Sequence, residues 1–442
     1  MGILNSIIGK KLSDHNGGVN RETFKQCIVK AENGDSVAQY NLAHMYMNGI
    51  GTKANKHEAL CWFKIAAEQG YQDAQLSLAY MYYAGYGIQI DYREALRWYE
   101  AAAKQGNIDA QNSVAYMYLN GYGADVDIEK ALYWYNESAK LGNVDAQNYL
   151  KDTFQINKAN ARHGDVDSQY ILFLMYSRGY GTEIDVNEAL YWGNLAVECN
   201  HKEALNNLVD LYANDEMLGT DLMEKFKLFK NAATQGNVTA QFKLAKMYEK
   251  GDGIEADLIE AVNWYSKAAE QGHIEAQFEV AMMYYNMYKL KQCDSELAEK
   301  WLKKAAEQGH LMAQHKLGRL YLEMSDIADD VYEYEYYRID AFNYLKMSAE
   351  QGYVKDQYEL AKLYLTRITW GPVEDDDKEK AMYWFNKSAE QGDVDAQFEL
   401  AGIYNSWKVG EPNLAEALKW YKMAADQGHK KAIEMLDRLR QK

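Results

Sequence analysis

Apolar and small residues recur along the chain at the spacing of an amphipathic α-helix. In residues 70–106, Ala74, Leu78 and Tyr82 fall on one face of a first helix, one helical turn apart. After a polar, glycine-containing stretch, a second run places Trp98 on the apolar face of a second helix. This pattern predicts a pair of helices within 36 residues, both of which bury one face.

The two-helix pattern repeats along nearly the whole chain. Glycine takes the left-handed backbone conformation that ends a helix without steric cost, so a periodic glycine indicates periodic helix ends. One helix pair cannot bury both of its faces alone, so about eleven stacked units are indicated. The positions that end the units are Gly34, Gly70, Gly106, Gly142, Gly164, Asn200, Gly236, Gly272, Gly309, Gly352, Gly392 and Gly428.

Large and small side chains occupy fixed places in the second helix of each unit. A pair of small residues, such as Ala102 and Ala103, lets neighbouring helices approach closely, and a Trp fills the space that this leaves. The Trp recurs at one register, at Trp62, Trp98, Trp134, Trp192, Trp264, Trp301, Trp384 and Trp420.

The complete motif of one unit reads Ala-Gln-x-x-Leu-Ala-x-Met-Tyr, then Gly-x-Gly, then Glu-Ala-x-x-Trp-Tyr, then Ala-Ala-x-Gln-Gly. It resembles the Sel1-like repeat, a relative of the tetratricopeptide repeat, over roughly residues 34–430. The resemblance implies an all-α fold: a right-handed α-α superhelical solenoid of about eleven Sel1-like repeats. It also implies a concave wall made mainly by the first helices, protein binding as the usual role, and no catalytic residues to carry over.

Departures from the repeat divide the chain into segments. The unit between Gly142 and Gly164 is too short for two full helices and lacks the Trp, so we expect it to change the stacking there. The predicted segments are a leader (1–19), an N-terminal capping helix (20–33), repeats one to three (34–142), a short irregular repeat (143–163), repeats five to eleven (164–427) and a C-terminal capping helix (428–442).

Composition restricts the partner and the compartment. A net charge of −17 disfavours nucleic acid and anionic membranes and favours a neutral or basic protein partner, although it can also serve solubility alone. The four cysteines do not recur at one register, which favours a reducing compartment. The chain has no stretch of 18 apolar residues and no secretory signal pattern. We therefore expect a cytoplasmic protein without a membrane span.

No residue pattern points to catalysis or to a cofactor. The Gly-x-Gly pairs lack the Lys-Ser/Thr of a phosphate-binding loop and are explained by helix termination. His273, His310 and His429 occupy one repeat position and so do not form a cluster, and no metal site is predicted. No nucleophile–base pair stands at a recognisable spacing. We expect a non-enzymatic protein with no cofactor and no metal.

An aromatic stripe on the first helices of the early units is the first candidate binding surface. These positions remain once the packing face has been assigned, and exposed Tyr on a concave wall suits a binding hot spot. The alternative is that the same residues pack against the next first helix. The stripe consists of Tyr40, His44, Leu76, Tyr80, Tyr83, Tyr116 and Leu119.

A second candidate lies in the unit between Gly309 and Gly352, which has 43 residues where most have 36. We expect the extra residues to form an acidic, tyrosine-rich loop from Ser325 to Asp340. The loop either steers a basic partner or is a tolerated insertion. Its predicted contact residues are Asp329, Asp330, Tyr332, Glu333, Tyr334, Glu335 and Tyr336.

Three functional hypotheses follow for a protein-binding solenoid. The first is a general scaffold or adaptor that uses the concave face. The second is a bacterial immunity or inhibitor protein that binds and neutralises a toxin or effector, for which an acidic surface would suit a basic target. The third is a bacterial protein that acts on host factors.

Overall fold

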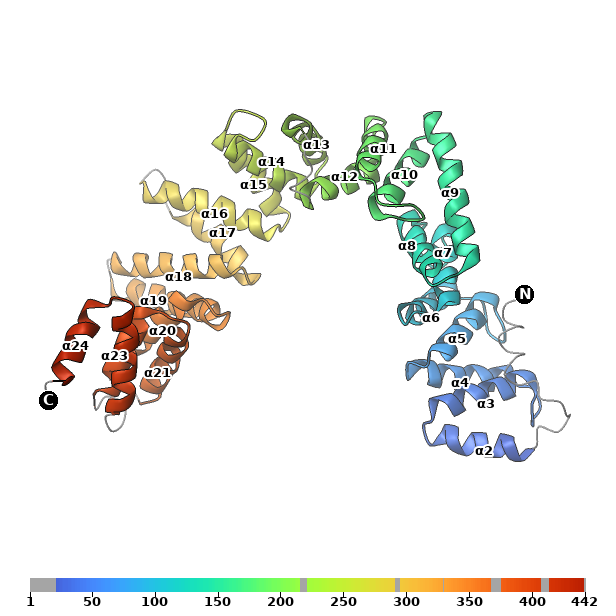
Figure 1. The fold of residues 1–442 in the computed structure, drawn as a ribbon, viewed down its shortest axis with the longest axis horizontal. Coiled ribbons are helices and arrows are strands. Elements are labelled where there is room, and N and C mark those ends of the chain that lie inside the picture. The colour runs from blue at the N-terminus through green and yellow to red at the C-terminus, as the bar shows by residue number, and fades with distance from the viewer. Residues whose placement is uncertain are drawn as a thin grey trace. The chain divides into compact units, whose positions relative to one another are not determined.

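A computed structural model of the 442-residue chain describes residues 21–214, 221–290, 295–328, 330–366, 375–406 and 413–440. Within these ranges the regular elements are 23 α-helices, α2 to α24 (Figure 1). The chain divides into two compact units, Met1–Leu208 and Val209–Lys442. The expected leader and Asp329 lie outside the described residues. The predicted all-α fold of repeated helix pairs is confirmed.

The first unit holds the early repeats, and α2 precedes them where the N-terminal capping helix was expected. Its helices are α2 (Arg21–Glu32), α3 (Ser36–Asn48), α4 (Lys56–Glu68), α5 (Gln72–Ala84), α6 (Tyr92–Lys104), α7 (Ile108–Asn120), α8 (Ile128–Lys140), α9 (Val144–Arg162), α10 (Val166–Arg178), α11 (Val186–Glu198) and the first residues of α12 (Lys202–Asn214).

The second unit continues the same alternation of first and second helices, and α24 occupies the place expected for the C-terminal cap. Its helices after α12 are α13 (Leu222–Thr234), α14 (Val238–Lys250), α15 (Leu258–Glu270), α16 (Ile274–Lys289), α17 (Glu296–Glu307), α18 (Leu311–Asp326), α19 (Val331–Glu350), α20 (Val354–Thr366), α21 (Asp375–Glu390), α22 (Val394–Tyr404), α23 (Leu414–Asp426) and α24 (Lys430–Arg440).

Local sequence signals set the helix ends of a regular repeat. Gly85 ends α5 with a φ of 67°, and its N–H donates to the Met81 carbonyl. The Asp91 carboxylate begins α6 by accepting hydrogen bonds from the N–H groups of the second and third helical residues. Asn200, which replaces the periodic glycine once, is the only non-glycine with positive φ (64°) among the described residues. It ends its helix pair as the glycines do.

The tryptophan side chains pack in the core, as their size predicted. Seven of the eight repeat tryptophans are buried, and Trp62, in the first repeat, is half-buried. The Trp98 indole N–H donates to Glu94 Oε2 one turn earlier on α6, at 3.2 Å. The same bond recurs from Trp192 and Trp264. The ring therefore fills the core while its polar edge stays hydrogen-bonded.

A glutamine on the first helix joins most repeats to the one before, and Leu205 replaces it in α12. Gln75 on α5 donates from Nε2 to the Ala67 carbonyl at the end of α4, at 3.2 Å. This satisfies a carbonyl that the last turn of a helix leaves unpaired. Equivalent bonds are made by Gln39, Gln111, Gln147, Gln169, Gln241, Gln277, Gln314, Gln357 and Gln397.

The same amide also binds the second helix of its own repeat. Gln75 Oε1 accepts a hydrogen bond of 2.7 Å from Gln105 Nε2 at the end of α6. One side chain on α5 thus bridges α4 and α6; we call this arrangement the glutamine bridge. The second bond recurs at Gln241, Gln277, Gln314, Gln357 and Gln397.

Four of these glutamines, Gln39, Gln111, Gln147 and Gln169, make the first bond of the glutamine bridge but not the second. Leu141 and Cys199 stand where the others have the donating glutamine. Neither residue can donate the second bond, so Gln111 Oε1 and Gln169 Oε1 are buried without a hydrogen-bond partner among the described residues. Gln39 Oε1 is unpaired too, although a glutamine occupies the donor position. A buried acceptor without a hydrogen bond destabilises the fold by about 1–3 kcal/mol.

We expect Leu141→Gln to raise the free energy of unfolding by about 1 kcal/mol, because it supplies the donor that Gln111 lacks. Leu141 is 52% exposed, so little packing is lost. Gln105→Leu is the matched control and should destabilise to a similar extent by removing an existing donor. Urea denaturation measures both, and a Leu141→Gln variant no more stable than the parent would contradict the role assigned to the bridge.

The short unit is one continuous helix, which confirms that residues 143–163 cannot form two. The start of α9 keeps the features of a first helix: Asn143 caps it, and Gln147 donates to the Ala139 carbonyl. Its end keeps those of a second helix, because the Ala161 carbonyl accepts from Gln169. The 19-residue α9 therefore joins the beginning of one helix to the end of another, without the intervening loop.

The loss of that loop brings the neighbouring repeats into contact. The N–H of Gly181, in the loop after α10, donates to Asn136 Oδ1 on α8, at 3.3 Å. A Cβ on Gly181 would lie 2.7 Å from the Cβ of Leu150 in α9. In a regular repeat the corresponding glycine, such as Gly87, faces the start of the preceding second helix at Lys56. The expected change in inter-repeat rotation stays a prediction.

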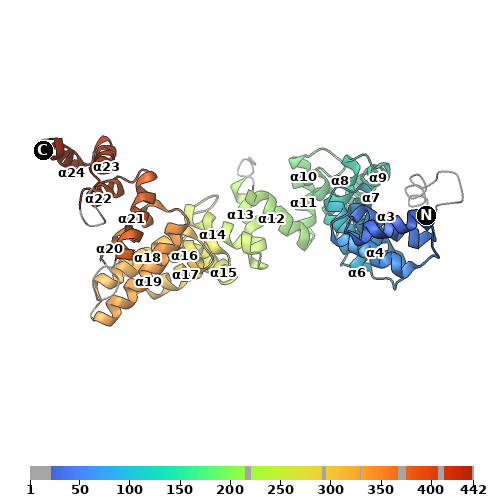
Figure 2. The same ribbon diagram turned by 90° about the horizontal axis from the view of Figure 1, so that it is seen from below.

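The prediction that Ser325 to Asp340 form a loop is wrong, because most of this segment is helical. The additional residues lengthen α18 to 16 residues and α19 to 20, and these helices lie side by side (Figures 1 and 2). Asp330 caps α19 by accepting from the Glu333 N–H at 2.9 Å. The Tyr337 ring then stacks on Tyr321 of α18, with ring centroids 6.0 Å apart. These contacts stabilise helix where the additional length of the unit suggested a loop.

Candidate binding pocket

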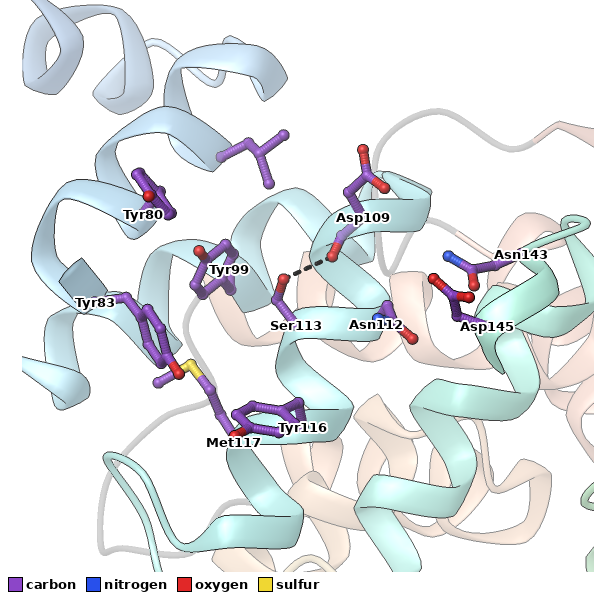
Figure 3. A pocket seen from close by; sticks show the side chains of 11 residues that line it. Tyr80, Tyr83, Tyr99, Asp109, Asn112, Ser113, Tyr116, Met117, Asn143 and Asp145 are labelled. Carbon is purple, nitrogen blue, oxygen red and sulfur yellow. Dashed lines mark hydrogen bonds between the residues drawn. The ribbon is translucent and has the colours of Figure 1, made fainter. Parts of the chain in front are cut away.

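A pocket of about 280 Å³ lies in the first unit, along the first helices α5 and α7 and the start of α9. Figure 3 shows Tyr80, Tyr83 and Tyr99 at one end, and Asn143 and Asp145 at the other. Asn112 lies between the two ends, and Tyr116 closes the side next to Tyr83. The lining residues are Leu76, Tyr80, Tyr83, Tyr99, Asp109, Asn112, Ser113, Tyr116, Met117, Asn143 and Asp145.

In most other repeats a pair of rings occupies the place of this pocket. The first ring lies on the first helix, and the second lies in the turn that leads to the next first helix. Phe242 and His273 form one such pair, with ring centroids 4.4 Å apart. Equivalent pairs are Tyr40–Tyr71, Tyr170–His201, Phe278–His310, His315–Tyr353 and Phe398–His429, with centroids 4.5–5.2 Å apart.

The pocket lies where two successive repeats lack such a pair. The corresponding positions hold Leu76 with Asn107, and Asn112 with Asn143. Asn143 still caps its helix, because Oδ1 accepts the Ala146 N–H at 2.9 Å. The asparagine keeps the cap that the histidine provides elsewhere, but it supplies no ring. We conclude that the pocket is the space that a ring pair would otherwise occupy.

Neighbouring rings hold the tyrosines of the pocket in place. The Tyr92 and Tyr122 rings stack on each other at 4.8 Å, and Tyr83 contacts both, at 5.5 and 6.2 Å. Tyr116 contacts Tyr122 at 6.1 Å. Tyr122 belongs to the Gly-x-Gly loop after α7, so that loop fixes the rings at the edge of the pocket. Tyrosines held in this way lose little conformational entropy when they bind a ligand.

The pocket is electronegative and contains no cation of its own. Neither Lys, Arg nor His is among its lining residues, whereas Asp109 and Asp145 both are. Burial raises the pKa of the Asp109 carboxyl, because desolvation disfavours the charged form. Asn112 Oδ1 is buried and has no hydrogen-bond partner among the described residues.

The structure brings four of the predicted stripe residues together: Leu76, Tyr80, Tyr83 and Tyr116 all line the pocket. Leu119 is half-buried and lies outside it. The sequence prediction missed the residues that make the site concave and polar. The replacement of the ring pair at Asn112 and Asn143 was the signal that could have revealed them. The missed residues are Tyr99, Asp109, Asn112, Ser113, Met117, Asn143 and Asp145.

Tyr40 and His44 belong instead to an aromatic cluster with Phe63 and Tyr71. The His44 ring lies 4.5 Å from Tyr40 and 4.9 Å from Phe63, and its side chain is only 5% exposed. Neither of its ring nitrogens has a hydrogen-bond partner among the described residues. Burial lowers the pKa of His44 to about 4. The expectation that His44 presents a contact surface is therefore wrong, because this side chain is in the core.

His44 should make the first unit sensitive to mild acid. Its pKa in the folded chain lies below its unfolded value of about 6.5, so the neutral imidazole is tolerated above pH 6.5. Stability is lost as the pH falls from about 6.5 towards 4, by about 2 kcal/mol at pH 5. We expect His44→Phe to abolish this loss and to pack against the same rings.

Urea denaturation of both proteins at pH 7.5 and pH 5 measures the difference. The carboxylates titrate alike in the two proteins, so the comparison isolates the imidazole. Equal losses of stability in the parent and in His44→Phe would contradict the pKa shift of the buried imidazole.

The family match agrees with this repeat structure. The Sel1 repeat model matches nine stretches that together cover more than half of the chain: 36–71, 72–107, 108–143, 166–201, 238–273, 274–310, 337–353, 354–393 and 394–429. The chain belongs to the Sel1 repeat family. The unmatched stretches of this Sel1 repeat protein include all of the irregular α9 and the beginning of the extended α19.

Solved structures of similar proteins come from several bacteria. A protective antigen of uropathogenic Escherichia coli with an SLR fold is 29% identical (TM-score 0.46), with 96% of this chain and 91% of that one covered. A Sel1 repeat protein from Oxalobacter formigenes is 37% identical (TM-score 0.28), over 29% and 98%. An immunity protein of Pseudomonas aeruginosa is 20% identical (TM-score 0.25), over 52% and 83%. No curated protein matches the chain.

The repeat histidines of this Sel1 protein act as helix caps. Nδ1 of His201, His273, His310 and His429 accepts the backbone N–H of the residue three positions later, at 3.1–3.2 Å. No group of three or more His, Cys, Asp or Glu residues in the described ranges is arranged to hold a metal ion. None of the described helices combines the length and apolar character that crossing a bilayer requires.

Proposed function

We propose that this chain is a non-enzymatic scaffold or adaptor that binds a partner protein through the pocket of the first unit. Sel1 repeats imply protein–protein interaction. The observation that supports this particular site is the missing ring pair, which leaves a tyrosine-lined pocket where six other repeats hold two rings. A cytoplasmic location is part of the proposal.

The size and lining of the pocket suit a partner's side chain. A space of about 280 Å³ can accept one long side chain inserted between rings and polar groups. Binding energy at protein interfaces is concentrated in a few anchors that fill well-packed pockets, and Tyr is prominent among the residues that receive them. Because neighbouring rings already fix Tyr83 and Tyr116, the pocket is preorganised for such an anchor.

Neutralisation of a bacterial toxin and action on host factors stay as alternatives. Both would require the same physical act, the binding of a protein, and they differ from the scaffold only in the identity of the partner. The net charge of −17 favours a basic partner in every case.

Two double variants test the pocket from opposite directions. Tyr80→Ala with Tyr116→Ala removes two anchors, and Asn112→Phe with Asn143→His fills the space with a ring pair like Phe242–His273. Each should weaken binding of the captured partner by about 30-fold or more, since losing a hot spot costs about 2 kcal/mol. Helical content should stay unchanged, as circular dichroism measures.

Tyr191→Ala with Tyr383→Ala is the matched control, because both of these tyrosines are exposed and neither lines the pocket. The partner is the protein that the full parent chain captures and the control variant retains. If both pocket variants bind it with undiminished affinity, the site lies elsewhere.

We further propose that the exposed start of α19 is a second contact. Tyr332 is 84% exposed there, and Glu333 and Glu335 lie beside it. Glu323 is excluded because it pairs with Lys289, and Asp330 is excluded because it caps the helix. Glu333 and Glu335 would attract a basic partner from a distance.

Glu333→Gln with Glu335→Gln should therefore slow association at low ionic strength and make the association rate less dependent on salt. Stopped-flow or surface-based kinetics with the captured partner measures both quantities. An unchanged rate and an unchanged salt dependence would remove this segment from the interface.

A further inference from the structure

The lining of the pocket includes hydrogen-bond acceptors that have no partner among the described residues. Asn112 Oδ1 is buried and unpaired. No ion pair involves the Asp109 or Asp145 carboxylate among the described residues, and no cationic side chain lines the pocket. The Tyr rings add faces that carry partial negative charge. The lining is therefore suited to a group that is cationic and rich in N–H donors.

The chain itself places cations on rings at the same register in other repeats. Lys246 Nζ lies 5.1 Å from the centroid of Phe242, and Lys362 Nζ lies 5.1 Å from the centroid of Tyr358. Lys246 and Lys362 occupy the repeat position that Tyr80 and Tyr116 hold in the pocket. Where these two repeats carry their own cation, the two repeats of the pocket carry a further ring instead.

We propose that the pocket binds the guanidinium group of an arginine side chain of the partner protein, an inference that rests on the proposed function. The flat guanidinium stacks on the faces of Tyr rings, and its N–H groups point outward in one plane. In this pocket they donate to Asn112 Oδ1 and to the carboxylates of Asp109 and Asp145. Arginine thus satisfies the unpaired acceptors and the aromatic faces at once.

Other occupants fit the same surface less well. An apolar side chain would cover Asn112 Oδ1 and the partly buried Asp109 without giving them a donor, and each acceptor left unpaired weakens binding. An anionic side chain is repelled by the two carboxylates. Lysine supplies the charge, but its ammonium group is strongly hydrated and has no flat face to stack on the tyrosines.

The desolvation of Asp109 supports the same assignment. Its carboxyl pKa is raised by burial alone, so the folded chain holds a carboxylate there without a compensating charge. A bound guanidinium would compensate that charge directly, through a charge-assisted hydrogen bond. Partner binding would then lower the Asp109 pKa and be weakened as this carboxyl becomes protonated.

The test uses the full chain and three small probes: N-acetyl-arginine amide, N-acetyl-citrulline amide and N-acetyl-lysine amide. Citrulline has nearly the shape of arginine but no charge. Ligand-observed saturation-transfer NMR measures the affinity of each probe. We expect the arginine probe to bind at least about tenfold more tightly than the other two, as one charge-assisted contact predicts.

Variants of the pocket residues test whether the arginine probe binds there. Asp109→Asn with Asp145→Asn should weaken the arginine probe by about tenfold or more, and Asn112→Phe with Asn143→His should abolish its binding. The control pair Tyr191→Ala with Tyr383→Ala should bind as the parent does. The assignment of arginine is overturned if the arginine probe fails to bind, if citrulline or lysine binds equally well, or if the Asp109/Asp145 variant is unaffected.

The captured partner separates this inference from the proposed function. If the Tyr80/Tyr116 variant loses the partner and the Asp109/Asp145 variant keeps it, the pocket binds a partner but not through arginine. If both variants keep the partner, the proposed function and the arginine assignment both fail. If both variants lose the partner and the arginine probe binds the parent, the proposed function and the arginine assignment are both supported.

Discussion

A buried amide that hydrogen-bonds to two other helices sets the register of the stack. The Ala and Leu residues on the packed faces attract without direction, so they would tolerate a small slip of one repeat against the next. The glutamine bridge does not, because a slip would leave both ends of the Gln75 amide unpaired in the core. The positions that face the wall therefore recur in the same place in each repeat. The two positions of a ring pair therefore lie at the same place on the wall in each repeat, whether or not rings occupy them.

The pocket follows from that regularity. With the register fixed, exchanging one ring pair for Leu76 and Asn107, and the next for Asn112 and Asn143, opens a space that the rings fill in six other repeats. No insertion or change of backbone is needed, because asparagine preserves the helix cap that histidine provides elsewhere. A family that varies such side chains can obtain a binding site without disturbing the stack.

The sequence predicted the features that follow from the repeat spacing. It missed those that depend on which side chains from other helices and turns lie nearby. The helix pairs, the buried tryptophans and four pocket residues follow from spacing alone. The repeat positions of Tyr40 and Tyr80 lie one helical turn apart on the wall, yet Tyr40 packs against Tyr71 while Tyr80 lines a pocket. That difference depends on which residue the following turn presents. The start of α19 was expected to be a loop because its unit has 43 residues where most have 36, but a cap at Asp330 and the Tyr337–Tyr321 contact stabilise a helix.

The central claim is that the pocket is an unfilled place for a ring pair and that the partner occupies it. The most direct measurement follows the melting temperature and the affinity for the partner in one variant, Asn112→Phe with Asn143→His. Filling the space should raise the melting temperature, because new apolar surface is buried and Asn112 Oδ1 is no longer left unpaired. The same variant should lose the partner, a gain of stability at the expense of function. A variant that melts higher and still binds the partner with the affinity of the parent would contradict the account.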